Sequence, residues 1–376
     1  MKEGWEYKTI KECCTELFAG GDVPKPDVSK NKTQNFTVPI YTNGVENEGL
    51  YGYTNNARVY EPAVTISARG TIGATFRRYT PFYPAIRLIT AVPNKGLLCI
   101  DYLYYALKTL TVGNSGTSIP QLTIPNIKNI VIPVPPLSEQ QSIVDYLDSA
   151  FAKIDAMKAN AEKALNEAKA LFQASLKEML EPKEGTRWST IGDLFETYSG
   201  GTPTKSNKEY YEGGTIPWLR SGEVCQKEIK ETEMFITEKG LKESSAKYYP
   251  ENTVVVAMYG ATAAQVGILR IKATSNQAVC GILPHKDFLP EFVYYWFSSI
   301  EDKLAAQAQG GAQPNISQQK IKKVEIPIYF ITEQQFIVAT LDSLKSKVDR
   351  LQANFEKISQ ECDALKQALL REVFEG

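Results

Sequence analysis

The residue types that carry most protein chemistry are sparse in this 376-residue chain. Its six cysteines lie at positions 13, 14, 99, 225, 280 and 362, and His285 is its only histidine. No two cysteines form a CxxC pair, so a structural zinc site has no recognisable ligand set and buried free thiols are expected. His285 lies in a turn-like LPHKD segment, which argues against Ser-His-Asp or Cys-His catalysis.

The motifs of nucleotide and nucleic-acid enzymes are also missing. There is no GxxxxGK[ST] loop and no GxGxxG after a strand. The Asp/Asn-Pro-Pro-aromatic motif of amino-methyltransferases is absent, since Pro135-Pro136 lies between Val and Leu. Pro26-Asp27 and the Glu-Ile-Lys at 228–230 lie too far apart to suggest a nuclease cluster, and paired glycines at 20–21 and 200–201 favour a structural role. We therefore expect no catalytic residue, no metal and no cofactor in this chain.

Arginine is the one chemically suggestive residue type, and it gathers in the first third of the chain. Residues 1–135 carry a net charge of +4, although the whole chain has 42 basic and 43 acidic residues. The planar fork of arginine suits phosphates and guanine edges better than lysine does. The residues concerned are Arg58, Arg69, Arg77, Arg78 and Arg87. A solvated surface is the alternative reading of such a run.

The elements that position these residues come from an internal repeat. Residues 116–148 match residues 310–342 at a constant offset of 194, with 13 identities that include Pro133 with Pro327 and the Glu-Gln-Gln at 139–141 with that at 333–335. The match extends upstream, where a segment from Trp5 resembles one from Trp188. Such a repeat predicts two similar units related by a pseudo-twofold axis.

Each half closes with a long predicted helix. Ser138 to Gln141 and Thr332 to Gln335 both read as capping boxes, and the first helix should stop near Pro182. Apolar residues then recur at steps of three and four, which is typical of a coiled coil. We expect the two helices to pair antiparallel, the first spanning roughly 65 Å. The predicted seam consists of Ile143, Leu147, Ile154, Met157, Leu171, Ile337, Leu341, Leu344, Val348, Leu351, Phe355, Ile358, Leu365 and Leu369.

The remaining segments indicate mixed globular units, so the predicted class is α+β. Glycine-interrupted apolar runs at 64–76 and 253–269 predict strands, whereas 102–107 and 292–297 predict short buried helices. The expected organisation is a globular domain at 1–136, a helix and linker at 137–185, a second globular domain at 186–330 and a second helix at 331–376.

Composition sets the broad class. Apolar residues make up 43% and charged residues 23% of the chain, which excludes a wholly disordered or fibrous protein. No apolar run reaches the roughly 18 residues of a membrane span, and the first residues lack an apolar signal-peptide core. A cytoplasmic location is the expectation.

Several motifs stand out in the second half of the chain and at the two helix starts. They are GGTPTK at 200–205, IPWLRSGEV at 216–224, SNQAVCGI at 275–282, GAQPNIS at 311–317 and the paired IPVPPLSEQQ and IPIYFITEQQ segments. Together they resemble the specificity subunit of type I restriction-modification systems. The resemblance covers essentially the whole chain. It implies two target-recognition domains that each read half of a split double-stranded DNA site, held at fixed spacing by the helices.

The same resemblance implies partners and contact residues. Two modification subunits that methylate adenine with S-adenosylmethionine would dock on the helices, and restriction subunits would add ATP- and magnesium-dependent translocation and cleavage. Candidate DNA contacts in the first unit are Arg58, Arg69, Arg77, Arg78, Ser118 and Gln121. Those in the second unit are Lys205, Arg220, Ser221, Tyr259, Gln277, Gln313 and Asn315.

Two other functional classes stay open at this point. A self-contained methyltransferase or nuclease would bind S-adenosylmethionine or cut DNA unaided. A coiled-coil adaptor that joins partner proteins would show no salt-dependent binding to duplex DNA.

Overall fold

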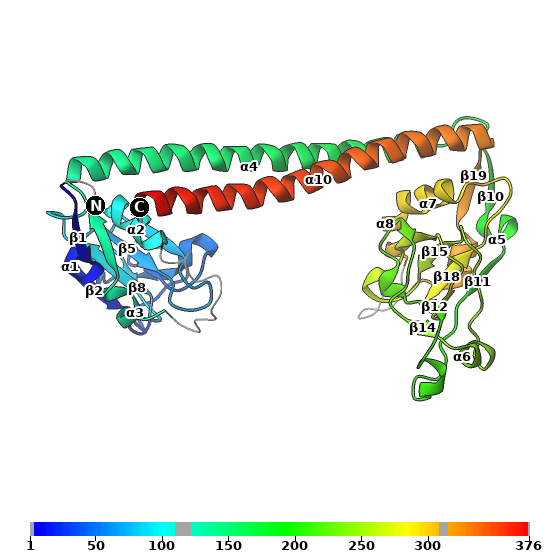
Figure 1. The fold of residues 1–376 in the computed structure, drawn as a ribbon, viewed down its shortest axis with the longest axis horizontal. Coiled ribbons are helices and arrows are strands. Elements are labelled where there is room, and N and C mark those ends of the chain that lie inside the picture. Colours follow the sequence, from blue (N-terminus) through cyan, green and yellow to red (C-terminus); the bar gives the residue numbers. More distant parts are fainter. Residues whose placement is uncertain (1–3, 110–121, 308–314, 375–376) are drawn as a thin grey trace. The chain divides into compact units, whose positions relative to one another are not determined.

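The computed structural model describes residues 4–109, 122–307 and 315–374. The chain divides into two compact units, the first formed by residues 1–163 with 354–376 and the second by residues 164–353. Each unit therefore contains one globular part and portions of both long helices, α4 (Leu137–Leu180) and α10 (Ile331–Phe374) (Figure 1). The predicted α+β class and the repeat are confirmed.

Unit 1 is built on three small sheets and several short helices. Its four-stranded sheet has the order β2-β8-β5-β6, its three-stranded sheet the order β4-β3-β7, and β1 pairs with β9. The strands are β1 (Glu6–Thr9), β2 (Cys14–Ala19), β3 (Val38–Tyr41), β4 (Leu50–Thr54), β5 (Ala63–Ile66), β6 (Thr75–Arg78), β7 (Tyr83–Pro84), β8 (Ile89–Pro93) and β9 (Val131–Val134). The helices are α1 (Ile10–Cys13), η1 (Glu46–Gly49), α2 (Ile100–Thr109) and α3 (Ile124–Lys128).

Unit 2 follows the same plan with one more strand in its larger sheet. The orders are β11-β18-β15-β16-β13 and β14-β12-β17, and β10 pairs with β19. The strands are β10 (Arg187–Thr190), β11 (Thr197–Ser199), β12 (Ile216–Leu219), β13 (Glu228–Ile229), β14 (Phe235–Ile236), β15 (Val254–Ala257), β16 (Val266–Leu269), β17 (Thr274–Ser275), β18 (Val279–Ile282) and β19 (Glu325–Ile328). The helices are α5 (Ile191–Leu194), η2 (Lys208–Tyr210), η3 (Ser221–Glu223), α6 (Glu238–Lys242), η4 (Gly260–Thr262), α7 (Pro290–Ser299), α8 (Glu301–Ala306) and α9 (Gln318–Lys322).

The start of each repeat is shifted by two residues from the sequence-based alignment. In the pairing of β10 with β19, Trp188 lies opposite Pro327, and in the pairing of β1 with β9, Tyr7 lies opposite Pro133. Since the two prolines are equivalent, Tyr7 and not Trp5 corresponds to Trp188. Trp5 instead donates its indole N–H to Glu139 at 3.0 Å.

The two long helices are antiparallel within each unit. In unit 1, Lys158 of α4 lies 3.4 Å from Asp363 of α10, and Asp155 pairs with Lys366. In unit 2, Lys169 donates to Gln352 at 2.8 Å. The earlier residue on α4 always meets the later one on α10, so the predicted coiled coil is confirmed, and its helices are 44 residues each.

The predicted seam is buried or half-buried at all but three of its residues, where the prediction is wrong. Met157 and Leu171 are 59% exposed and Leu365 is 48% exposed. The buried apolar face of α4 runs instead through Val144, Leu147, Phe151, Ile154 and Leu165. At positions 158 and 366 the seam contains lysines, whose ammonium groups are paired with aspartates of the facing helix. Because lysine is polar, the prediction chose the adjacent apolar residues Met157 and Leu365 in place of Lys158 and Lys366.

The predicted capping boxes are also wrong. The long helices begin at Leu137 and Ile331, as the predicted ranges have it, so Ser138 and Thr332 lie two residues past the cap positions Pro136 and Phe330. The backbone N–H of Gln140 already bonds to the carbonyl of Pro136, so Ser138 lies inside the first turn and not at the cap. Gln141 donates to Asp145 at 2.8 Å, one turn further along the helix.

Candidate nucleic-acid interface

The paired glycines hold the two sheets of each unit close together. A Cβ on Gly20 would lie 2.5 Å from the carbonyl oxygen of Pro84, and one on Gly200 would lie 2.2 Å from that of Ser275. Only glycine fits such an approach. The predicted structural role is confirmed, and Pro84 and Ser275 are thereby equivalent positions of the repeat.

Each globular unit is locked to a long helix by a cation, two tyrosines and an aspartate. In unit 1 the hydroxyl of Tyr105 on α2 donates to Asp148 of α4. The guanidinium of Arg77 lies 4.2 Å from the ring centre of Tyr104, 2.9 Å from Asp101 and 3.2 Å from Asp148. Burial works to lower the pKa of Arg77, but the hydrogen bond to Asp148 and the charges of both carboxylates raise it. These contacts give Arg77 a structural role in unit 1.

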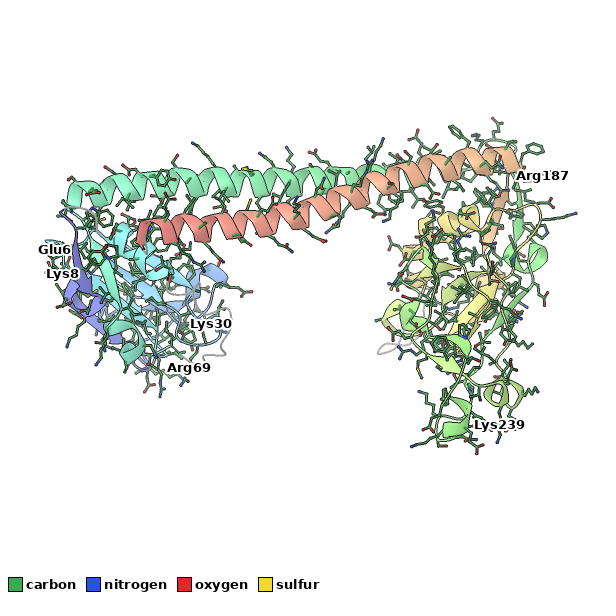
Figure 2. The ribbon with its side chains drawn as sticks, in the orientation of Figure 1. Glu6, Lys8, Lys30, Arg69, Arg187 and Lys239 are labelled. Atoms are coloured by element: carbon green, nitrogen blue, oxygen red, sulfur yellow. The ribbon has the colours of Figure 1, made fainter. Side chains whose placement is uncertain are left out.

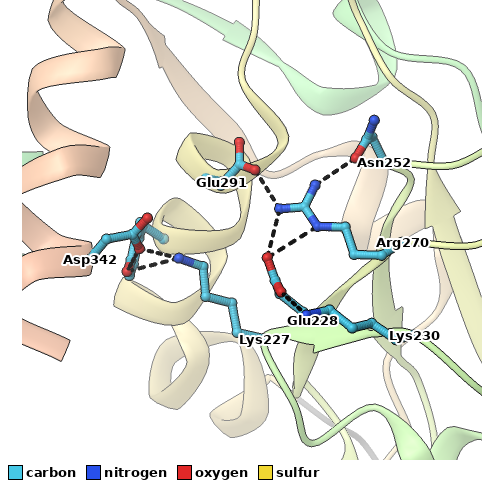
Figure 3. A network of polar contacts seen from close by, with 8 residues as sticks. Lys227, Glu228, Lys230, Asn252, Arg270, Glu291 and Asp342 are labelled. Atoms are coloured by element: carbon cyan, nitrogen blue, oxygen red, sulfur yellow. Dashed lines mark hydrogen bonds and ion pairs between the residues drawn. The ribbon is translucent and has the colours of Figure 1, made fainter. Parts of the chain in front are cut away.

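Unit 2 makes the same lock with a cation from the bend that precedes β13. Tyr295 of α7 and Lys227 both donate to Asp342 of α10, and the Lys227 ammonium lies 4.6 Å from the Tyr295 ring centre. Figure 3 shows this pair beside a second network, in which Arg270 joins Glu228 at 3.2 Å to Glu291. Asp148 and Asp342 are equivalent positions of the repeat. The aspartate is thus the same in both units, whereas its cation is Arg77 of β6 in unit 1 and Lys227 in unit 2.

Arg78 is removed from the candidate DNA contacts. Its side chain is only 2% exposed, and its guanidinium donates to Thr65 at 3.1 Å and to Glu48 at 2.9 Å. It also lies 3.5 Å above the ring of Tyr41. Burial lowers the pKa of Arg78 despite Tyr41 and Glu48, and a group so enclosed cannot reach a partner. The prediction for Arg78 is therefore wrong, whereas Arg77, whose side chain is 25% exposed and paired with Asp101 and Asp148, stays a predicted contact.

Arg58 and Arg69 remain at the surface of unit 1. Arg58 is exposed and lies 4.3 Å from the ring centre of Phe18. Arg69 is exposed in the turn between β5 and β6. Figure 2 shows Arg69 and Lys30 at the edge of unit 1 remote from the helix α4. Ser118 and Gln121 lie outside the described residues.

Tyr259 and Asn315 are neighbours in unit 2. Their backbones form an antiparallel bridge, and the next N–H, that of Ile316, donates to Met258 at 2.8 Å. The same bond in unit 1 runs from Leu122 to Ala68, at 3.0 Å. Arg69 therefore takes the position of Tyr259, although the two lie in segments of little sequence similarity.

Three more candidates of unit 2 surround one cavity. Lys205, Arg220 and Gln277 line a space of about 490 Å³. Arg220 pairs with Glu233 and lies 3.5 Å from Glu223, which fixes its guanidinium at the rim. Ser221 is partly buried in η3, next to Arg220, and Gln313 lies outside the described residues.

Sequence reasoning missed the cavity's other residues, which include Lys208, Tyr211, Trp218, Met234 and Asn276. Trp218 and Asn276 stand inside the motifs IPWLRSGEV and SNQAVCGI. Their neighbours Arg220 and Gln277 were selected for their polarity, whereas the aromatic floor had no polar signal. Among the described residues no group of histidine, cysteine or acidic side chains could hold a metal.

Comparison with known proteins identifies the family. The sequence model of the type I restriction modification DNA specificity domain matches residues 2–167 and again residues 183–360. The chain belongs to this family. The family is the DNA target-recognition subunit of type I systems, which does not favour the adaptor alternative.

Specificity subunits of other type I enzymes are similar to this chain over much or part of its length. The specificity subunit of the type I restriction enzyme EcoR124I/EcoR124II of Escherichia coli is 28% identical over 84% of this chain and 81% of its own. That of MjaIX from Methanocaldococcus jannaschii is 32% identical over 46% of this chain and 41% of its own.

Solved structures share the fold. The HsdS subunit from Thermoanaerobacter tengcongensis superposes with a TM-score of 0.62 at 19% identity, over 100% of this chain and 98% of that one. A chain from a solved type I R-M system gives 0.78 at 18% identity, over 99% and 98%. None of the helices in the described ranges has the length and apolar character to cross a membrane.

Proposed function

We propose that the chain selects a bipartite DNA site, with each globular unit reading one half. The observation that carries this proposal is a shared backbone with different exposed side chains. Arg69 stands where Tyr259 stands, and from the equivalence of Pro84 and Ser275, Ile86 takes the position of Gln277. Two copies of one scaffold with unlike surfaces suit an asymmetric site.

In this proposal, Arg58 and Arg69 of unit 1 and Lys205, Tyr259, Gln277 and Asn315 of unit 2 meet the DNA. Cations position the duplex through its phosphates, while amide and arginine groups read the donor and acceptor pattern of the bases. All six are exposed. A contact surface of this composition should bind with strong dependence on salt concentration.

We further propose that α4 and α10 fix the unread spacer and dock two modification subunits. Exposed apolar side chains on the helices support docking, since Met157 and Leu171 on α4 and Phe336 on α10 are each more than half exposed. The chain itself would carry no reaction. Adenine methylation with S-adenosylmethionine, and translocation and cleavage with ATP and magnesium, would belong to the partner subunits, in the cytoplasm.

Methylome sequencing tests this function. A methylation-free host would express the chain with its neighbouring modification subunit, and a second culture would express that subunit alone. A gapped, two-part adenine-methylation motif that appears only with both proteins is the expected result. Absence of any motif from a complex shown to be folded and assembled would contradict the proposal and favour an adaptor.

A further inference from the structure

The cavity in unit 2 has the size of a small-molecule site. It measures about 490 Å³ and lies beside the sheet β14-β12-β17. Ligand pockets of a few hundred Å³, largely apolar with a few polar groups, enclose most of a small ligand. Tyr211, Trp218 and Met234 supply the apolar surface here.

The aromatic floor already has its polar atoms satisfied. Trp218 is buried, and its indole N–H donates to the carbonyl of Gly201 at 3.0 Å. The hydroxyl of Tyr211 donates to the carbonyl of Pro203 at 2.6 Å. The two rings meet edge to face at 6.0 Å between centroids. What they offer a ligand is therefore ring surface, chiefly that of the half-buried Tyr211, because Trp218 is only 3% exposed. Ring surface favours a flat, aromatic group.

The polar side of the cavity presents mainly donors, and its one carboxylate, Glu212, lies 3.6 Å from the ammonium group of Lys208. The side-chain oxygen of Asn276 accepts from the N–H of Ala278 at 3.1 Å, and that of Gln277 accepts from the hydroxyl of Thr202. Each amide is thereby left with its NH₂ group for a ligand. Lys205 adds a positive charge to this lining. A flat ring with acceptor atoms and an adjoining negative charge is the chemistry of a nucleotide.

We propose that this cavity takes one unstacked nucleotide, with its base on Tyr211 beside the edge of Trp218, its acceptor edge on Asn276 and Gln277, and its phosphate at Lys205. The nucleotide can come from the bound duplex, by extrusion of one base, or from free nucleotide in solution. The first source rests on the proposed function. Unit 1 is not included, because Ile40 and Ile86 take the register positions of Trp218 and Gln277.

A mispair scan tests the duplex source. The full chain with its modification subunits would bind duplexes that carry its methylation motif, with each base pair of the motif and its flanks mispaired in turn. A duplex should bind more weakly when the mispair replaces a base pair that the protein reads in the groove. A duplex should bind more tightly, by about tenfold, when the mispair includes the extruded base, because breaking that base pair is no longer a cost of binding.

A double variant assigns the effect to the cavity. Lys205→Ala with Gln277→Ala should abolish the tightening, whereas Lys286→Ala, an exposed lysine outside the lining, should retain it. Tightening that persists in the double variant belongs to the modification subunits and counts against the proposal. Circular dichroism would confirm that the variants are folded.

Saturation-transfer NMR with dAMP, dCMP, dGMP and dTMP tests the free source. Transfer that the double variant loses supports a nucleotide site whether or not the duplex supplies its ligand. If no mispair tightens binding and no free nucleotide shows transfer, the proposal is overturned. Binding of the fully paired duplex, measured in the same series, tests the proposed function separately.

Discussion

Gln140 and Gln334, which lie 194 residues apart, make the same three hydrogen bonds in the two halves of the chain. Both side chains are fully buried. The Gln140 amide donates to the carbonyls of Pro135 at 2.8 Å and Leu97 at 2.7 Å, and accepts from the N–H of Cys99 at 3.0 Å. One side chain thus joins the start of α4 to the segment that leads into α2.

The partners of Gln334 repeat this arrangement at the start of α10. Its amide donates to the carbonyls of Tyr329 at 3.0 Å and Asp287 at 2.8 Å, and accepts from the N–H of Leu289 at 2.9 Å. Leu289 precedes α7 as Cys99 precedes α2. The equivalence explains why the Glu-Gln-Gln triplet is repeated in the sequence.

Replacing either buried glutamine should destabilise its own unit. Gln334→Ala would leave two carbonyls and one N–H buried without a partner, which should cost about 2–4 kcal/mol of unfolding free energy. Gln335→Ala is the matched control, since that side chain is exposed, and it should cost less than about 0.5 kcal/mol. Urea unfolding of the four single variants at 140, 141, 334 and 335 would measure the difference. Equal costs for neighbours would contradict the assignment.

The repeat revealed this motif in the sequence, but not which glutamine is buried. The capping-box interpretation selected Gln141 because it placed the helix cap two residues too late, at Ser138 instead of Pro136. In the structure Gln140 shares the buried face of α4 with Val144 and Leu147. Which glutamine is buried depends on where the helix begins. The turn at Pro136 sets that start, and the spacing of polar residues does not reveal it.

The corrected seam leads to a second prediction. Leu165 is 3% exposed and Leu171, in the same helix, is 59% exposed. Leu165→Ala should therefore cost about 2–4 kcal/mol of unfolding free energy, and Leu171→Ala less than about 1 kcal/mol. Thermal unfolding of both variants checks this. If the predicted stripe through Met157 and Leu171 were the packed one, the order of the two melting temperatures would be reversed.

The buried tyrosines predict loss of stability in alkali. Burial, then the hydrogen bond to Asp342 and its charge, raise the pKa of Tyr295 far above its usual value. The unfolded chain therefore releases this proton first, near pH 10, and stability falls above that pH by about 1.4 kcal/mol per pH unit for each such tyrosine. Below pH 10 its contribution is fully present.

Tyr295→Phe separates this effect from general alkaline unfolding. The variant should be less stable at pH 8 by about 1–2 kcal/mol, because the hydrogen bond is lost. Its stability should then fall less steeply above pH 10, so that the gap to the parent protein narrows. Tyr60→Phe, at a 66% exposed site, should leave the parent curve unchanged. Parallel curves for Tyr295→Phe and the parent would refute the linkage.

The candidate DNA contacts show where sequence reasoning stops. Arg77 and Arg78 looked alike as a basic dipeptide, yet each found an acidic partner from a distant segment, Asp148 and Glu48. No local pattern marks such pairings. Arg69 sits among turn residues between two strands, and its side chain is exposed there.

Salt dependence of DNA binding distinguishes the two kinds of arginine. If Arg69 neutralises a phosphate, Arg69→Gln should weaken binding to all duplexes equally and reduce the slope of log K against log salt by about 1. If it reads a base, the loss of about 1–3 kcal/mol should be confined to the specific site. Fluorescence anisotropy between 50 and 200 mM salt, with specific and unrelated duplexes, separates these outcomes.

Lys153→Gln provides the matched control, because it removes one exposed charge from α4 and none from the globular surface. It should change neither slope nor specificity. Arg78→Gln should lower the melting temperature, because it breaks the buried contacts to Thr65 and Glu48, and should leave the slope of the folded protein intact. If Lys153→Gln reduced the slope as much as Arg69→Gln did, the loss would reflect net charge alone, and the turn between β5 and β6 would not be part of the interface.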